Sequence, residues 1–375
     1  MSALRVAFVT ESSQVWGAET SLLLLLQEFD KLSIEATTII ADQSPFAEQL
    51  VEGGLPFIRH KFAKHHALSS GSLSTAKISD LLREPPPIVK SALRLRKILK
   101  NFDVVVIFSL WQSAEVLLAS KLARVQCVLD LHETFDGRFS SQIVKAVSQA
   151  CAGVIAPSKS VLSSNKLEPG GAIIVVPRPV HAETQETFSV GSRRYRIGMF
   201  GQVVPHKRVD RLVAAVEKCG DDTVSVLVVG GEREESSRSS YEVDMRARLS
   251  QLEGSAFLNR VNDVGRYMKQ CDVIVNLSDH EAFGRTVIEA LQYGAYPVVV
   301  DGGGPAEVVR NVGVGLVLKT IEELEKFVCN LRADSTLGFT RERNDWHLKV
   351  AQYGPKQVAK HYVDVLEKLI VENQK

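Results

Sequence analysis

Short runs of valine and isoleucine recur along the chain, and segments with apolar residues at helical spacing separate them. Near-continuous apolar strands that alternate with helices are typical of a parallel sheet covered on both faces. The first series therefore predicts an α/β domain with a doubly wound sheet. Its expected strands are Arg5–Thr10, Thr37–Ile40, Pro56–Ile58, Val104–Phe108, Val125–Leu131, Gly153–Ala156 and Ile173–Val176.

A polar stretch with two prolines, Pro177–Arg194, follows this series and is the best candidate for a linker between domains. A second alternating series begins after it, and a length of 375 residues fits two domains better than one core. We predict domains at residues 1–180 and 195–354. Expected strands of the second are Tyr195–Gly201, Val224–Gly230, Ala256–Val261, Val273–Leu277, Tyr296–Val300 and Gly315–Leu318.

Charge and cysteine content narrow the classes of protein. The chain carries 45 basic and 44 acidic side chains, so its overall charge gives no indication of nucleic-acid binding. Its five cysteines are scattered, without a close pair at metal or redox spacing, which predicts reduced thiols and a cytoplasmic protein. Neither a signal peptide nor a membrane span is expected, because the longest leucine run, Leu22–Leu26, is far too short.

One polar region interrupts the first series between His60 and Lys100. Three prolines, Pro85 to Pro87, are expected to stop any helix there. Residues 88–100 after them combine an apolar stripe at helical spacing with five basic side chains. Such a segment either packs as a surface helix on its own domain or lies on an anionic membrane surface, and we expect the former more than the latter.

The loop that follows the apolar run Val273–Leu277 is the strongest candidate for a ligand-binding site. It contains Glu281 and then opens a helix that carries Glu289. Backbone N–H groups at a helix start bind anions, and nearby carboxylates accept hydrogen bonds from sugar hydroxyls. Phosphate plus sugar is the predicted ligand, although a solvated charge and an ordinary helix-start carboxylate would give the same spacing.

Other strand ends carry weaker signals. Lys207 follows Gly201 in a loop that opens a helix and could serve a diphosphate, while Gly230 ends the next strand and permits close approach. In the first half Gly17 lies in a loop before an apolar helix, and His132 ends a strand. Taken alone, these could equally be an ordinary turn glycine and a hydrogen-bonded structural histidine.

The motifs together are similar to those of the retaining glycosyltransferases of family 4. The resemblance rests on GMFGQVVPHKRVDRLVAA, SVLVVGG and HEAFGRTVIEALQYGAYPVVVDGGGPAEVV, where the last resembles the family's EX7E signature. WGAET, DLHET, VIAPSKS and VVPRPV extend it more weakly over the first half. It implies the GT-B fold, in which two Rossmann-like domains face across a cleft. It also implies that the final helix, within residues 355–375, crosses back to the N-terminal domain.

The resemblance assigns roles to residues of both halves. Lys207 would bind the donor diphosphate, Glu289 the ribose, and Glu281 the transferred sugar. His132 would lie near that sugar, so the implied catalytic set is Glu281, His132 and Lys207. Further implied donor contacts are Gly17, Gly201, Gln202, Gly230, Phe283, Gly284 and Arg285.

The implied activity is retaining transfer of a sugar from a nucleotide-diphosphate donor, a UDP- or GDP-sugar, to a hydroxyl of a saccharide or lipid-linked acceptor in polysaccharide or glycoconjugate biosynthesis. No metal or other cofactor is implied, and peripheral membrane contact through residues 88–100 is a secondary expectation. Gln202 stands where the family commonly has arginine, and Trp16 where it has a second glycine. These departures keep open a binding or assembly protein with impaired catalysis. The enzymic alternative is another GT-B activity, such as a nucleotide-sugar epimerase or a phosphorylase.

Overall fold

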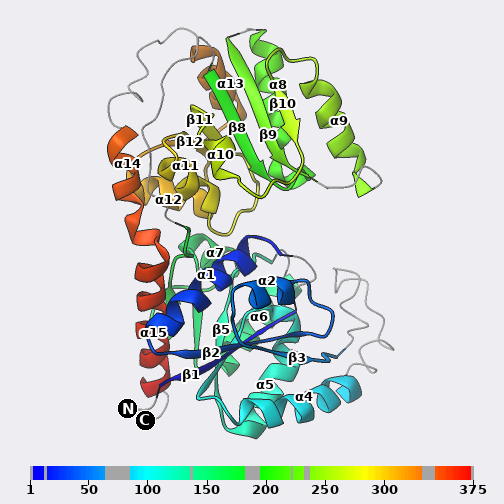
Figure 1. Cartoon of the computed structure of the whole chain (residues 1–375), viewed down its shortest axis with the longest axis vertical. Helices are drawn as coiled ribbons and strands as arrows, with labels where there is room; N and C mark the ends of the chain where they lie inside the picture. The colour runs from blue at the N-terminus through cyan, green and yellow to red at the C-terminus, as the bar shows by residue number, and fades with distance from the viewer. Residues whose placement is uncertain are drawn as a thin grey trace. The chain divides into compact units, whose positions relative to one another are not determined.

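The computed structural model describes residues 3–11, 15–63, 85–135, 138–181, 195–220, 223–231, 237–331 and 343–372. The chain divides into two compact units, Met1–Pro179 with Pro355–Lys375, and Val180–Gly354 (Figure 1). Each unit has its own parallel sheet, so the α/β, doubly wound, Rossmann-like architecture expected from the sequence is confirmed. Residues 182–194 of the expected linker lie outside the described part of the chain.

The sheet of the first unit has seven strands in the order β3-β2-β1-β4-β5-β6-β7. Neighbouring strands are parallel, and β1 lies between β2 and β4. The apolar runs are buried because helices cover both faces of such a sheet. The strands are β1 (Arg5–Thr10), β2 (Glu35–Ala41), β3 (Phe57–His60), β4 (Val104–Ile107), β5 (Gln126–Asp130), β6 (Gly153–Ala156) and β7 (Ile173–Val175).

Alternate residues of β1 and β4 enter different sides of this sheet. Val6 and Phe8 belong to a core with the helices that follow β1 and β2, whereas α5 packs on β4 and β5 and α4 packs on α5. Two-residue periodicity is what places successive side chains on opposite faces. The helices are α1 (Gly17–Lys31), α2 (Phe46–Glu52), α4 (Pro85–Leu99), α5 (Ser113–Ala123), α6 (Arg138–Ala150) and α7 (Lys159–Ser164), with a short 3-10 turn, η2, at Leu110–Gln112.

The last helix, α15 (Pro355–Glu372), completes the first unit although it follows the whole of the second in sequence. Its apolar side, which includes Val358, Tyr362 and Leu369, is buried in the core formed by β1 and α1. The ring of Tyr362 lies 6.1 Å from that of Phe8 and 5.9 Å from that of Phe29. The expected return of the C-terminal helix to the N-terminal domain is therefore confirmed.

The second unit contains a six-stranded parallel sheet in the order β10-β9-β8-β11-β12-β13. One face is covered by α8, α9 and α13 and the other by α10, α11 and α12. Its strands are β8 (Tyr195–Gly201), β9 (Val224–Gly230), β10 (Ala256–Leu258), β11 (Val273–Asn276), β12 (Tyr296–Val300) and β13 (Leu316–Leu318). Its helical segments are η3 (Pro205–Lys207), α8 (Val209–Cys219), α9 (Ser240–Leu249), α10 (Gly265–Met268), α11 (Arg285–Gln292), α12 (Gly304–Val312), α13 (Ile321–Asn330), α14 (Arg343–Lys349) and η6 (Ala351–Tyr353).

The expectation that Pro85 to Pro87 stop any helix is wrong, because α4 begins at Pro85. Proline is tolerated in the first turn, where its missing N–H would have no helical acceptor. The apolar stripe at Ala92, Leu95 and Leu99 is buried within the first unit. Packing on its own domain, the favoured expectation, therefore holds for that stripe.

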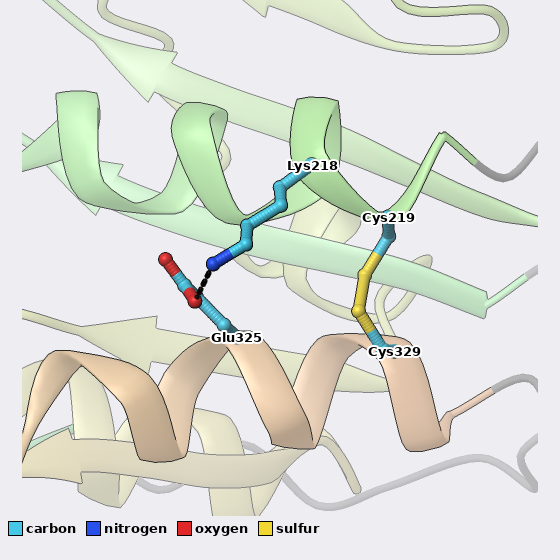
Figure 2. The surroundings of a disulfide bond; sticks show 4 residues. All are labelled: Lys218, Cys219, Glu325 and Cys329. Atoms are coloured by element: carbon cyan, nitrogen blue, oxygen red, sulfur yellow. Dashed lines mark hydrogen bonds and ion pairs between the residues drawn. A yellow bond between two sulfur atoms is a disulfide. The ribbon is translucent and has the colours of Figure 1, made fainter.

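Two cysteines correct the expectation of reduced thiols. Cys219 at the end of α8 and Cys329 near the end of α13 form a disulfide, with Cα atoms 5.5 Å apart (Figure 2). They are separated by 110 residues in sequence, so no local spacing could reveal the pair. Packing of α13 against α8 brings them together, beside an ion pair between Lys218 and Glu325. Cys127, Cys151 and Cys271 are free thiols.

Removal of this bond is expected to destabilise the second unit. A double Cys219→Ala, Cys329→Ala variant should lose about 2–4 kcal/mol of unfolding free energy, because the cross-link restricts a long loop of the unfolded chain. Urea denaturation measures the loss, and thiol titration of the denatured wild type should find three thiols of the five cysteines. Lys218→Ala, a control at the exposed neighbouring ion pair, should cost less than about 1 kcal/mol. Five titratable thiols, or a double variant as stable as the control, would contradict the prediction.

Candidate functional site

The order of strands in the second unit reverses between β8 and β11, which are neighbours in the sheet but distant in sequence. Ligands of open α/β sheets bind outside the carboxyl ends of strands at this kind of reversal. The loop after β8 carries Lys207, and the loop after β11 carries Glu281. Asp279 N–H donates to the carbonyl of His206 at 3.0 Å, so the backbone joins the two loops directly.

Lys207 and Glu281 form the centre of this arrangement. The ammonium group donates to Glu281 Oε2, and both side chains are mostly buried. Ser278 Oγ donates to the same carboxylate oxygen at 3.2 Å. The structure therefore brings together two residues that the sequence placed 74 positions apart, with a cation and an anion presented at the same sheet edge.

A second ion cluster flanks the first. Arg208 Nε donates to Asp279 Oδ2 at 2.6 Å, and Arg211 approaches Oδ1 at 3.3 Å. Arg208 has a φ of 58°, in the left-handed region that glycine adopts without strain. Position 208 therefore has a backbone conformation that favours glycine, and the ion pair with Asp279 accompanies the arginine found there.

The loop between Glu281 and α11 is shaped by close packing against the start of α12. Gly284 has a φ of 90°, and a Cβ there would lie 2.7 Å from Pro305 Cα. Gly304 N–H donates to the carbonyl of Glu281 at 2.9 Å. Only glycine fits the turn at position 284, and the turn starts α11 at Arg285. The helix start, with its positive dipole end, therefore lies within four residues of Glu281.

The residues on either side of Gly284 have different environments. Phe283 is buried, and its ring lies 5.9 Å from that of Tyr353, so its side chain serves the core and only its backbone remains for a ligand. Arg285 Nη2 lies 3.3 Å from Glu289 Oε1. Both charged side chains remain partly accessible on the helix surface. Two glutamates were expected to serve one ligand. Glu281 lies in the loop before α11 and Glu289 lies on α11 itself, so one continuous segment carries both.

Gly201 and Gly230 approach each other at the ends of β8 and β9. A Cβ on Gly230, whose φ is 150°, would lie 1.7 Å from the carbonyl oxygen of Gly201. A side chain there is therefore excluded, which gives Gly230 a steric role in the backbone between two strand ends. Gln202, directly after Gly201, is half-buried. Gly231 follows Gly230 and ends the motif SVLVVGG, and residues 232–236 lie outside the described part of the chain.

In the first unit, Gly17 begins α1, and Trp16 precedes it with an extended backbone. Trp16 N–H donates to Glu19 Oε2 at 2.9 Å, so the glutamate of WGAET caps the helix start. This function of Glu19 was not apparent from the motif alone.

His132 lies beside a buried charge cluster that the sequence analysis did not find. Asp130 Oδ2 accepts from Arg178 Nη1 at 2.9 Å and from Tyr362 Oη at 2.7 Å, and His132 Nδ1 lies 3.8 Å from Asp130 Oδ1. Burial opposes ionisation of Asp130, but the charge and hydrogen bonds of Arg178 and the contact with His132 outweigh it and lower its pKa to about 2. The cluster ties β5, the segment after β7 and α15 to one another.

Nothing local in the sequence could reveal this cluster, because its members lie at positions 130, 178 and 362. Ser278 was equally missed, although its place three residues before Glu281 was a weak signal. In the described part of the chain, no group of three or more histidine, cysteine, aspartate or glutamate side chains is arranged to hold a metal ion. None of the helices described there has the length and apolarity needed to cross a bilayer.

Two sequence-family models match the chain and decide its family. The model described as Glycosyltransferase Family 4 matches residues 15–184, and the one described as Glycosyl transferases group 1 matches residues 183–332. The chain is a family 4 type glycosyltransferase. The matched segments cover both units, so the resemblance found in the motifs is confirmed.

Curated relatives of this glycosyltransferase match over a limited stretch. A GDP-mannose-dependent alpha-mannosyltransferase of Mycolicibacterium smegmatis is 29% identical over 161 residues, which cover 43% of this chain and 39% of the relative. Sucrose synthase 1 of Hordeum vulgare is 27% identical over 178 residues, 41% of this chain and 21% of the relative. The matches thus span less than half the length of these relatives.

Solved structures match this glycosyltransferase along almost its whole length. The Anabaena protein HepE, solved in complex with UDP-glucose, has a TM-score of 0.76, is 17% identical and covers 97% of this chain and all of its own. A glycosyltransferase from Rickettsia africae has a TM-score of 0.78, is 17% identical and covers 99% of each chain. These likenesses show a shared fold, which is the GT-B fold expected from the motifs.

Proposed function

We propose that this protein is a retaining glycosyltransferase that moves a sugar from a UDP- or GDP-sugar to a hydroxyl of a saccharide or lipid-linked acceptor. The second unit would bind the donor and the first the acceptor. The relatives support a nucleotide-sugar donor, since one is a GDP-mannose-dependent enzyme and one structure contains UDP-glucose. The proposed setting is polysaccharide or glycoconjugate biosynthesis.

The contact between Lys207 and Glu281 at the strand-order reversal is the observation that supports the proposal most. A nucleotide sugar combines a diphosphate with a hydroxyl-rich ring. Lys207 offers a cation for the diphosphate, and Glu281, in direct contact with it, offers a hydrogen-bond acceptor for the hydroxyls. Binding of the diphosphate would draw Lys207 from Glu281 and leave the carboxylate for sugar hydroxyls. Glu289, on the following helix, would then hold the ribose.

The proposed reaction exchanges one bond at the anomeric carbon for another on the same face. The bond from that carbon to the diphosphate oxygen breaks, and the acceptor oxygen forms the new bond. The acceptor proton passes to the leaving phosphate, so no protein base is assigned. Lys207 and the start of α11 would stabilise the negative charge that develops on the diphosphate, without a metal in this proposal. His132 would line the sugar site from the first unit.

A cytoplasmic location and peripheral membrane contact remain parts of the proposal, although the location no longer follows from reduced thiols, since Cys219 and Cys329 form a disulfide. The apolar stripe of α4 is buried, so any contact with anionic lipid would use the exposed basic face of residues 88–100 together with Val89 and Leu93, which are 45% and 47% exposed. Each basic side chain near such a surface adds to the attraction.

Thermal-shift measurements against a panel of UDP- and GDP-sugars test donor binding. The cognate donor at about 100 times its Kd should stabilise the folded protein by about 2.7 kcal/mol and raise Tm by about 5–10 °C. The same panel, incubated with candidate acceptors, should give transfer product and free nucleoside diphosphate with retained anomeric configuration. Binding without turnover on any acceptor would favour the impaired binding protein, and free converted sugar would favour the epimerase.

A further inference from the structure

Four rings stand in two pairs at the carboxyl ends of β4 and β5. Phe108 and His132 form the inner pair, with ring centroids 4.5 Å apart. Trp111 and Phe135 form the outer pair, with centroids 6.5 Å apart and planes at 79°. Each outer ring follows its inner ring by three residues in sequence, so the two neighbouring strands each contribute one member to each pair.

The pairs differ in their access to solvent. Phe108 is 1% exposed and lies against the buried charge cluster, with the Arg178 guanidinium 5.9 Å from its ring. Trp111 is 37% exposed, and Phe135 is half-buried. Each inner ring is therefore followed, three residues later in sequence, by an outer ring that is at least partly exposed. A single exposed apolar side chain is common and needs no explanation, so the position of the outer pair is what carries the inference.

That position is the place where the strand order of the first sheet reverses. The sheet runs β3-β2-β1 in one direction and β4-β5-β6-β7 in the other, so the loops after β1 and β4 border the crevice in which such sheets bind ligands. Gln112 Nε2 donates to Glu11 Oε2 and joins these two loops. Trp111 is the residue directly before Gln112, within η2.

The two loops that carry the outer pair are also held in place. Gln112 is fully buried, and its N–H donates to the carbonyl of Ser109. In the loop after β5, Asn165 Nδ2 donates at 2.9 Å to the carbonyl of Glu133, two residues before Phe135. Rings on loops that are already ordered lose little conformational freedom when a ligand binds.

We propose that Trp111 and Phe135 form an aromatic platform that binds a pyranose ring of the acceptor saccharide. A pyranose presents its C–H groups largely on one face, and aromatic rings have electron-rich faces that attract polarised C–H groups while burying apolar surface. The indole N–H at the ring edge can donate to a sugar hydroxyl. This inference rests on the proposed function, because His132, beside the platform, is the residue assigned to the transferred sugar.

A nucleobase is the other planar ligand that stacks on aromatic side chains. The residues assigned to the diphosphate and the ribose, Lys207 and Glu289, belong to the second unit, so the nucleobase is expected there and the platform in the first unit is assigned to the acceptor. A binding experiment distinguishes the two kinds of ligand, because methyl glycosides carry a pyranose without a base and UDP or GDP carries a base without a pyranose.

NMR of the indole N–H signals tests binding directly. The chain has three tryptophans, and Trp→Phe variants assign their signals. We expect the Trp111 signal to shift on titration with a panel of methyl α- and β-pyranosides, and to shift much less with UDP or GDP. A Trp111 signal that stays in place with every pyranoside, or that shifts only with the nucleotides, would overturn the proposal.

Kinetics of the wild-type transfer reaction supply the second test. Trp111→Ala should raise KM for the acceptor about tenfold while KM for the donor stays within about twofold, which is the size of effect expected for loss of one aromatic contact. Leu122→Ala is the matched control, because Leu122 is 40% exposed near the far end of α5, away from the strand ends. An acceptor KM equal to that of the control would refute the platform. Pyranoside binding without any transfer would refute the proposed function and support the platform.

Discussion

Replacing Lys207 with alanine is expected to lower kcat for sugar transfer about 10²–10³-fold, the usual cost of removing one preorganised group that stabilises developing charge. Lys207 is the cation held at the strand-order reversal of the second unit, in contact with Glu281. Its loss would leave the departing diphosphate without this positive charge. Initial rates of nucleoside diphosphate release at saturating donor and acceptor measure the effect.

The same experiment includes its controls. Lys218→Ala removes a more exposed lysine of the same unit, which is paired with Glu325 on the helical face near the disulfide (Figure 2), and should leave kcat unchanged. Glu281→Ala should also lower kcat, and the double variant should lose less than the product of the two single losses because the side chains interact directly. If Glu281→Ala retains both turnover and donor affinity, the assignment of this site is wrong.

Replacing Arg178 with methionine is expected to destabilise the first unit by about 3–5 kcal/mol, because it leaves the Asp130 carboxylate buried without its cation. Both side chains are almost fully buried, and Tyr362 on α15 donates to the same carboxylate. The loss would therefore weaken the attachment of the C-terminal helix as well as the sheet. Urea denaturation followed by near-ultraviolet circular dichroism measures it.

Arg5→Met is the matched control in the same unit. Arg5 pairs with Asp103 at 2.7 Å, but these side chains are 45% and 38% exposed, so removing the surface pair should cost far less than removing the buried one. Equal losses in the two variants would show that burial of the Asp130 pair has no special effect.

The pH dependence of stability gives an independent measurement. Asp130 has a pKa of about 2 in the folded protein, below its ordinary value of 3.8, so its contribution is complete above about pH 4 and is lost as the pH falls toward 2. The shift corresponds to about 2 kcal/mol. Arg178→Met should lose this part of the wild-type acid dependence, whereas Arg5→Met should retain it. A wild-type profile shared by the Arg178 variant would contradict the assignment.

Strand positions were predictable because buried parallel strands are continuous apolar runs. Tyr195–Gly201, Val224–Gly230 and Tyr296–Val300 were predicted with the bounds that the structure has. The start of α4 was not, because three prolines break a helix in its interior but are accepted in its first turn. Local patterns therefore determined where strands lie better than where helices begin.

The residues of the candidate site were also predictable only in part. Glu281, Gly284 and Glu289 belong to one segment whose spacing the sequence displays directly, and Lys207 follows a glycine loop of similar character. Their contact depends on β8 and β11 being neighbours, which follows from the order of strands and not from either loop. The strand order similarly unites Trp111 with Phe135, which the sequence analysis did not consider.

By itself, the sequence determined the α/β class, the two series of strands, the family and the loop that holds Glu281, because each depends on residues close together in the chain. Tertiary structure alone decided the Cys219–Cys329 bond and the Asp130–Arg178–Tyr362 cluster, whose members are separated by 48 to 232 positions. Such contacts form only when packing of helices on the sheets closes long loops. The buried charge cluster and the disulfide therefore depend on the fold, and no local sequence pattern indicates either of them.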